Sequence, residues 1–350
     1  MKKVYLALIT LGILLVSVED TLAQFNRKSI KSNNRRISSY RGGKTSFRYK
    51  YNSVGFSINA LNYYGDLAPR PNRLSTDISF TRPGFGLSYA HRFGPRYVLM
   101  GNFMFGTLRG SDASADKNDE ANGTFRYTRN LSFRNQIKEF SVIAQFDLFN
   151  NTSTYMVRPK WTPYGFVGIA GFFHNPQAKA PATDLQGNPL PEAGEWVKLR
   201  PLGTEGQNGG LDPTDANHGI KKYSTAQIAI PFGVGVRFKL MPELDLAAEI
   251  GFRYTFTDYL DDVSRNYVGL DKLGSPLAQA MSYRTNELPA TDRPAATVAT
   301  NIPGVLVVPG YGHEFPTNNR GSSNDNDIYM VTSIRLSYIL KATYHRPKFR

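Results

Sequence analysis

The sequence lacks several residue types and patterns on which enzyme sites depend. It contains no cysteine, so disulfide bonds, thiolate metal sites and cysteine nucleophiles are all excluded. Its five histidines lie beside no pattern of serine and carboxylate that would suggest a hydrolase, and a lipase-type nucleophile elbow is absent. The sequence therefore predicts a protein that is not an enzyme and gives no indication of a cofactor.

Long apolar runs are also missing once the N-terminus is passed. The N-terminal run, residues 4–16, follows Lys2 and Lys3 and precedes Thr21-Leu22-Ala23, a pattern typical of a secretory signal peptide cleaved after Ala23. An uncleaved anchor is the alternative, although the run is short for a membrane-spanning helix. We expect residues 1–23 to be a signal peptide and the mature protein to be exported.

Acidic residues are absent between Gln24 and Lys50, in a chain whose net charge is +14. This segment is rich in Ser and Asn and cannot bury a core, so residues 24–52 are expected to form a disordered periplasmic arm. The arm either docks an acidic protein partner or anionic head groups, or is a solvated linker. Nucleic acid is not an expected partner of an exported chain. The docking candidates are Arg27, Lys28, Lys31, Arg35, Arg36, Arg41, Lys44, Arg48 and Lys50.

What the sequence has in abundance is apolar residues at every second position. The alternation is strongest between Tyr223 and Asp262, where apolar residues hold one phase and charged or small residues the other, across a break at residues 241–243. Side chains on a strand point alternately to opposite faces, so one face of this hairpin is continuously apolar. Such strands suit a barrel whose outside meets lipid and whose inside is polar.

The same alternation predicts an eight-stranded antiparallel transmembrane β-barrel over residues 53–344, followed by a short basic tail, residues 345–350. Long and short connections alternate, as expected for short periplasmic turns and long outer loops in an outer membrane. The partner on the outside is then membrane lipid. A soluble β-sandwich, which also contains many alternating strands, is the alternative fold. Besides the hairpin, the predicted strands are residues 53–64, 83–93, 96–108, 136–149, 164–173 and 328–340.

Charged residues recur on the inward phase of these strands. The interior of an eight-stranded barrel is just wide enough for side chains to fill it, and buried charges need partners. We expect these residues to pair into a plug that stabilises the barrel; a proton or ion path is the alternative. They are Arg92, Asp147, Arg237, Asp245, Glu249, Arg253 and Arg335.

An acidic loop motif follows the seventh predicted strand. Its carboxylates could supply oxygen ligands to calcium, but their spacing is not that of the twelve-residue calcium loop, so a solvated or salt-bridged loop is favoured and no metal site is predicted. The motif consists of Thr257, Asp258, Tyr259, Leu260, Asp261 and Asp262.

Eight short stretches, ordered from the first strand to the last long loop, carry a family resemblance. They are Asn62–Leu67, Arg129–Arg134, Thr162–Ile169, His174–Pro176, Trp196–Leu199, Pro201–Gln207, Ile230–Gly233 and Thr255–Ser264. Together they resemble the PorG-like family of outer-membrane β-barrels, one of whose members belongs to the type IX secretion machinery. The resemblance implies a signal-bearing eight-stranded barrel and, for the secretion member, a role in tying the periplasmic ring of that machine to the outer membrane.

We therefore expect a non-enzymatic outer-membrane component that anchors or docks a periplasmic envelope complex such as the type IX protein secretion machinery. The alternative is a small barrel with an enzymatic or ligand-binding site at its long-loop end, where His174 and Asp258 would act.

Overall fold

The computed structural model of the protein describes residues 49–68, 81–120, 123–323 and 325–340. The expected signal peptide, the expected tail and every docking candidate of the arm except Lys50 lie outside the described residues.

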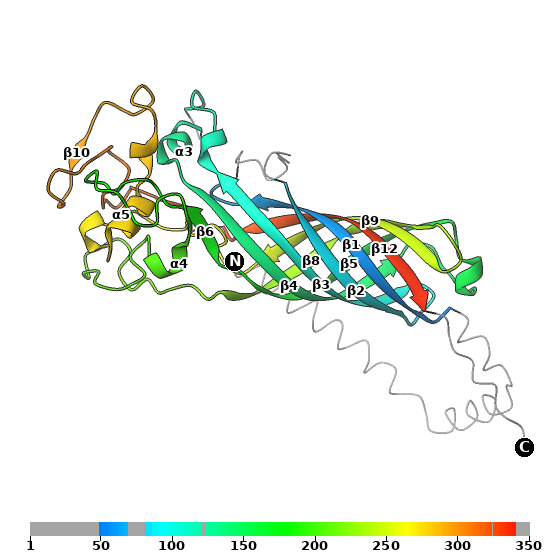
Figure 1. The fold of residues 1–350 in the computed structure, drawn as a ribbon. Coiled ribbons are helices and arrows are strands. Elements are labelled where there is room, and N and C mark those ends of the chain that lie inside the picture. The colour runs from blue at the N-terminus through cyan, green and yellow to red at the C-terminus, as the bar shows by residue number, and fades with distance from the viewer. Residues whose placement is uncertain (1–48, 69–80, 121–122, 324, 341–350) are drawn as a thin grey trace, which may run out of the picture. The chain divides into compact units, whose positions relative to one another are not determined.

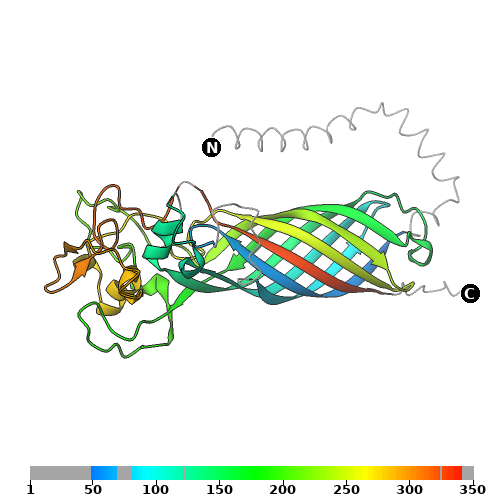
Figure 2. The ribbon, with the colours of Figure 1, turned by 90° about the horizontal axis from the view of Figure 1, so that it is seen from above.

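Eight long antiparallel strands close into a barrel. Each neighbour in the order β3-β2-β1-β12-β9-β8-β5-β4 is hydrogen-bonded to the next, and an additional β3–β4 pairing closes the ring (Figures 1 and 2). The predicted eight-stranded antiparallel barrel is confirmed, because closure leaves no open edges of the kind found in a β-sandwich. The strands are β1 (Tyr51–Tyr64), β2 (Arg82–Arg92), β3 (Tyr97–Ser111), β4 (Ser132–Asp147), β5 (Trp161–Phe173), β8 (Ala226–Lys239), β9 (Leu244–Thr255) and β12 (Ile328–Leu340).

Several strands are longer than predicted. Strand β1 begins at Tyr51, so the predicted barrel boundary at residue 53 lies inside it. The β3–β4 pairing continues to Ser111 opposite Ser132, beyond the predicted ends of both strands. In this extension the alternation of large apolar residues fades while the backbone pairing continues, so the pattern underestimated the strand length.

The outer wall of the barrel is apolar and the inner wall polar. Phe140 and Ile334 point outward and are 58% and 59% exposed, whereas inward-facing Ser57 and Asn59 are only 5% and 4% exposed. A continuous exposed apolar wall is unfavourable in water but matches the lipid-facing surface of a transmembrane barrel. The wall therefore confirms the predicted transmembrane β-barrel.

The two ends of the barrel differ. At the short-turn end, residues 93–96, 148–160 and 240–243 connect consecutive strands, and the 148–160 connection contains the turn η3 (Tyr155–Val157). At the long-loop end, the described parts of the other connections form what we call the loop cap (Figure 1). The cap contains η2 (Asp112–Ser114), α3 (Gly123–Arg129), β6 (Pro176–Lys179), β7 (Trp196–Lys198), α4 (Leu199–Leu202), η4 (Leu270–Lys272), α5 (Pro276–Ser282), η5 (Thr285–Glu287), β10 (Val298–Ala299) and β11 (Leu306–Val307). No helix in the described ranges has the length and apolarity to cross a membrane.

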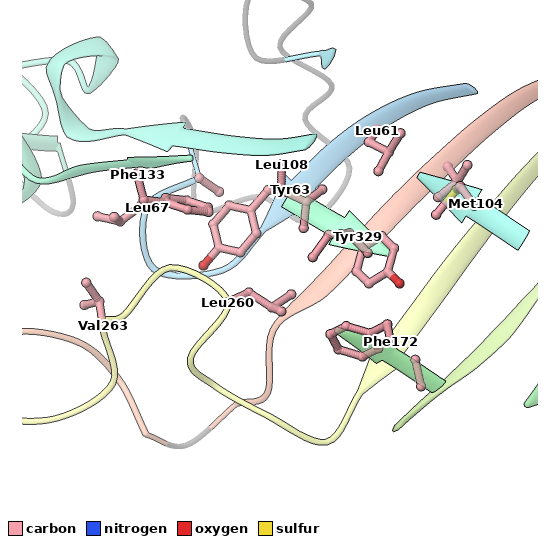
Figure 3. Packing of buried hydrophobic residues seen from close by; sticks show 14 of the residues in the cluster. Leu61, Tyr63, Leu67, Met104, Leu108, Phe133, Phe172, Leu260, Val263 and Tyr329 are labelled. Atoms are coloured by element: carbon pink, nitrogen blue, oxygen red, sulfur yellow. The ribbon is translucent and has the colours of Figure 1, made fainter. Parts of the chain in front are cut away.

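The loop cap is joined to the barrel by a shared hydrophobic core. Leu260 and Val263 from the connection after β9 pack with Tyr63 of β1, Phe133 of β4 and Tyr329 of β12, all at most 4% exposed (Figure 3). A second buried cluster, which includes Tyr267 and Val307, lies within the cap itself. The described parts of the long connections are therefore packed structure rather than solvated loops.

Candidate functional site

The lumen is filled by ion pairs at successive levels between the strands. Near the short-turn end, an oxygen of Asp147 lies 2.6 Å from Nη1 of Arg92 and 3.2 Å from Nη1 of Arg237. The side chains of Arg92 and Asp147 are 2% and 1% exposed. Removing one member would leave a buried charge without its partner, so the three residues act as a unit.

Asp245 makes its ion pair with a residue that the alternation did not identify. Its Oδ1 lies 2.5 Å from Nη2 of Arg158, which stands in the β4–β5 connection. Arg158 also donates to the carbonyl oxygen of Pro242, at 2.6 Å, in the β8–β9 turn. Because Arg158 lies outside any strand, strand phase gave no signal for it. Its contacts fold the β4–β5 connection over the mouth of the barrel.

The middle of the lumen is organised around Glu249. One carboxylate oxygen of Glu249 accepts hydrogen bonds from Arg335 and from the hydroxyl of Tyr164, the latter at 2.6 Å. Gln145 donates to the same oxygen at 3.4 Å and accepts from Arg237 at 3.2 Å. Gln145 therefore links the middle level to the level below.

The upper level pairs Arg253 with Glu139 at 3.5 Å, and Tyr329 donates to Glu139 at 2.7 Å. Glu139 was missing from the predicted set, although it shares the inward phase of Ser141 and could have been found by completing that phase. All seven predicted lumen residues thus lie inside the barrel and enter ion pairs.

The loop motif forms a clamp between the barrel and the loop cap. The hydroxyl of Tyr63 lies 2.7 Å from Oδ2 of Asp261 and 2.7 Å from Oδ1 of Asp327, and both carboxylates are 1% exposed. The other oxygens accept backbone N–H bonds, from Val263 to Asp261 and from Leu260 to Asp327, each at 2.9 Å. Burial and neighbouring carboxylates raise the pKa of Asp261 and of Asp327 well above the usual range.

Asp262 extends the clamp to the connection between β5 and β8. Its carboxylate accepts from the hydroxyls of Thr204 at 2.5 Å and Tyr223 at 2.7 Å. Arg320 pairs with Glu205 at 3.0 Å and also donates to the backbone carbonyl of Asp262. Burial raises the pKa of Asp262 to about 6, although Arg320 acts in the opposite direction. Asp262 has φ 72°, a left-handed conformation that these bonds hold in place.

The remaining members of the motif support the clamp. The backbone of Leu260 accepts from Asn135 at 2.7 Å, and the carbonyl of Thr257 accepts from the N–H of Asp327 at 3.0 Å. Tyr259 stacks on Tyr223 with ring centroids 4.7 Å apart. The motif is therefore a buried, hydrogen-bonded element with an ion pair between Asp262 and Arg320, which agrees with the salt-bridged form of the expected loop and not with the solvated form.

A second clamp surrounds Arg129 at the end of α3. Its guanidinium donates to both oxygens of Asp112, at 2.8 and 2.9 Å, and to the backbone carbonyl of Asp66 at 2.9 Å. Another N–H reaches the carbonyl of Arg320, in the last long loop. One buried cation thus fastens three connections together. Burial raises the pKa of Asp66 to about 6, against the opposing effect of Arg129.

The two residues of the enzymatic alternative occupy different surroundings. His174 is 2% exposed; its ring contacts the carbonyl of Ser224 at 3.0 Å and stacks on Tyr223, and burial lowers its pKa to about 4. Asp258 is partly buried, and burial raises its pKa to about 9. Within the described ranges, no group of three or more His, Cys, Asp or Glu side chains has the arrangement needed to hold a metal ion.

Comparison with known proteins identifies a family without an assigned function. The family model described as "Domain of unknown function (DUF6089)" matches residues 44–185 and 214–273, more than half of the chain. No curated protein matches the chain.

Among solved structures, the chain is similar in fold to three outer-membrane or surface proteins. For Ail, the attachment invasion locus protein of Yersinia pestis, the identity is 8% and the TM-score 0.31, covering 83% of this chain and 97% of that one. For Neisserial surface protein A the identity is 9% and the TM-score 0.33, and the match covers 82% of this chain and 96% of that one. For the outer membrane protein OprG from Pseudomonas aeruginosa the identity is 8% and the TM-score 0.33, and the match covers 85% of this chain and 99% of that one. At these identities and scores the similarity says nothing about function.

Proposed function

This chain belongs to the DUF6089 family, and we propose that it is a non-enzymatic outer-membrane barrel that anchors or docks a periplasmic envelope complex, such as the type IX protein secretion machinery. The observation that carries the proposal is the filled lumen. Ion pairs occupy it at the levels of Asp147, Glu249 and Glu139, and an eight-stranded barrel has no room for an aqueous channel beside them. A barrel that conducts nothing has its function at its ends or in its wall.

The location in an outer membrane is part of the proposal. A closed antiparallel barrel with an apolar outer wall is the membrane-spanning form typical of that membrane, and the first 23 residues have the pattern of a secretory signal. Short turns face the periplasm in such barrels, so the end at which β1 begins and β12 ends would face it here.

Charge favours the short-turn end as the docking end. The nine basic residues between Arg27 and Lys50 immediately precede β1, and no acidic residue interrupts them. Positive charge of this density attracts acidic protein surfaces and speeds their encounter. The PorG-like resemblance supports a secretion role, because one member of that family belongs to the type IX secretion machinery. The motifs around Arg129 and Asp262 form the clamps at the opposite, long-loop end.

The test is a crosslinking pull-down from intact cells with a deletion of residues 24–48. We expect the shortened protein to remain inserted and heat-resistant, because the strands begin at Tyr51, while it recovers less of its periplasmic partners. A control variant replaces the segment with a neutral Gly/Ser linker of equal length, which separates loss of charge from loss of length. Unchanged recovery in both variants would contradict docking through the arm.

A ligand-binding site in the loop cap is the second candidate. It is favoured by two buried carboxylate oxygens that have no hydrogen-bond partner among the described residues, Oε2 of Glu205 and Oδ2 of Asp258. The test compares Asp258→Ala and His174→Ala with the wild type in a screen of lipids and peptides. Absence of binding or turnover in the wild type would exclude this candidate.

A further inference from the structure

The short-turn end of the barrel contains a small pocket among charged side chains. Four of these lining residues are cations and two are carboxylates, so the pocket holds more positive than negative charge at neutral pH. The charged lining residues are Arg92, Asp147, Arg158, Arg237, Lys239 and Asp245.

The two carboxylates of the pocket are already engaged. Asp147 is shared between Arg92 and Arg237, and Asp245 pairs with Arg158. The ammonium group of Lys239 donates to the backbone carbonyl of Met156, which is neutral. The ion pairs among the lining residues therefore leave positive charge that no carboxylate of the pocket neutralises.

A buried donor in the same pocket also lacks an acceptor. The side chain of Arg92 is 2% exposed, and its Nε has no hydrogen-bond partner among the described residues. An N–H of a charged group that is buried without an acceptor is unfavourable, so buried polar groups of this kind usually find a partner. The excess positive charge and the free N–H donor both favour a negatively charged acceptor in this pocket.

We propose that the pocket accepts a carboxylate side chain from an acidic segment of a periplasmic protein. The proposal rests on the docking function above and specifies the chemistry of the partner. A carboxylate supplies acceptor oxygens and a negative charge, which suit the unpartnered Nε–H of Arg92 and the ammonium group of Lys239.

The position of the pocket favours a protein rather than a lipid as the molecule that supplies the carboxylate. The pocket residues on the strands, such as Asp147 and Arg237, lie on the inner wall, whereas lipid surrounds the outer wall. A head group could enter only by drawing its lipid across the rim. A protein segment on the periplasmic side would reach the pocket directly from the short-turn end of the barrel. Basic residues that precede Tyr51 and follow Leu340 in the sequence add long-range attraction for an acidic segment.

The experiment measures binding of a fluorescein-labelled tetra-aspartate peptide to the full chain in nanodiscs, by fluorescence anisotropy at low salt. Lys239→Gln removes one uncompensated charge of the pocket. The matched control is Lys160→Gln, because Lys160 is exposed and its carbonyl accepts the backbone N–H of Lys239, so it lies on the same rim. The basic arm is present in all proteins and contributes equally to each.

We expect Lys239→Gln to weaken peptide binding about tenfold and Lys160→Gln to weaken it less than about twofold. The Lys239→Glu variant should bind the peptide less tightly than Lys239→Gln. All variants should retain the heat-resistant migration of the wild type. Equal weakening by the Lys239 and Lys160 substitutions would show that binding follows net charge alone and would overturn the proposal.

Two further measurements distinguish the possible sources of the anion, and distinguish the pocket proposal from the docking function. Competition of the peptide by equimolar inorganic phosphate would assign the pocket to a small free anion and overturn the protein-docking proposal. If the arm deletion reduces partner recovery in cells while Lys239→Gln leaves peptide binding unchanged, the pocket proposal fails and the docking function stands. If Lys239→Gln weakens peptide binding while deletion of the arm leaves partner recovery unchanged, the pocket proposal stands and docking through the arm fails.

Discussion

The phenol oxygen of Tyr63 lies 2.7 Å from Oδ1 of Asp327, although the two residues are 264 positions apart in the chain. The same oxygen lies 2.7 Å from Oδ2 of Asp261. A hydroxyl carries one proton, so it can donate to only one of these oxygens. The other contact is a hydrogen bond only if that carboxyl group is itself protonated. The geometry therefore implies a proton held between the two buried carboxyl groups, where the barrel meets the loop cap.

This shared proton makes the stability of the loop cap dependent on pH. In the folded state the pKa of Asp261 and Asp327 is raised well above the unfolded value of about 4, and the pKa of nearby Asp66 is raised to about 6 and that of Asp258 to about 9. Groups of this kind stabilise the fold fully below the unfolded pKa, and that contribution is lost as the pH rises through the raised pKa. We expect the cap to open more readily as the pH increases from about 4 to about 9.

Hydrogen exchange at the amides of Leu260 and Val263 measures this opening. In the wild type, protection corrected for the intrinsic exchange rate should fall as the pH rises. Asp327→Asn mimics the protonated carboxyl group at every pH, so the fall should be shallower in this variant. A slope equal to that of the wild type would contradict a titrating carboxyl pair. Tyr63→Phe removes the hydroxyl and should lower protection at all pH values, by about 1–3 kcal/mol.

Arg129 provides a test of the second clamp. Arg129→Met leaves Asp112, which is fully buried, without the guanidinium that binds both of its oxygens. Breaking a buried ion pair by removing one partner destabilises by about 3–5 kcal/mol, and Arg126, which lies 3.4 Å from the same carboxylate, should keep the loss near or below the lower end of that range. We expect limited proteolysis to cut the loop cap of this variant while the barrel stays heat-resistant. The control is Arg109→Met, since Arg109 is exposed; equal resistance of the two variants to protease would contradict the clamp.

The sequence was sufficient for the barrel and insufficient for the cap, for one physical reason. Lipid outside and ion pairs inside impose a strict two-residue period, which is legible at residues such as Phe140 and Glu249. The clamps depend instead on contacts between distant segments, such as Tyr63 with Asp327, and no local period records them. Asp261 and Asp262 were recognised as part of a motif, but their role needed the positions of Tyr63 and Thr204.

The lumen makes a prediction about stability and conductance together. Arg335→Met leaves the carboxylate of Glu249 in the lumen without its cation, so the unfolding free energy should fall by about 3–5 kcal/mol. Adding Glu249→Gln removes the unpaired charge and should restore part of the loss in a double-mutant cycle. Unfolding in lipid vesicles measures both values. Additive losses would contradict coupling between the two residues, and steady ionic conductance of the wild type in a planar bilayer would contradict the filled lumen.

The apolar wall predicts how the cost of a charge depends on its depth in the membrane. Ile334 stands midway along β12, opposite Ile58 on β1, and is 59% exposed, whereas Leu340 is the last residue of the strand. A cation at the bilayer midplane costs about 2–4 kcal/mol, and one near the interface about 0–1 kcal/mol, because a long side chain near the edge reaches water. Ile334→Arg should therefore lower the unfolding free energy in vesicles by the larger amount and Leu340→Arg by the smaller. Equal effects of the two substitutions would contradict the prediction that Ile334 faces lipid at the bilayer midplane and Leu340 lies near the interface.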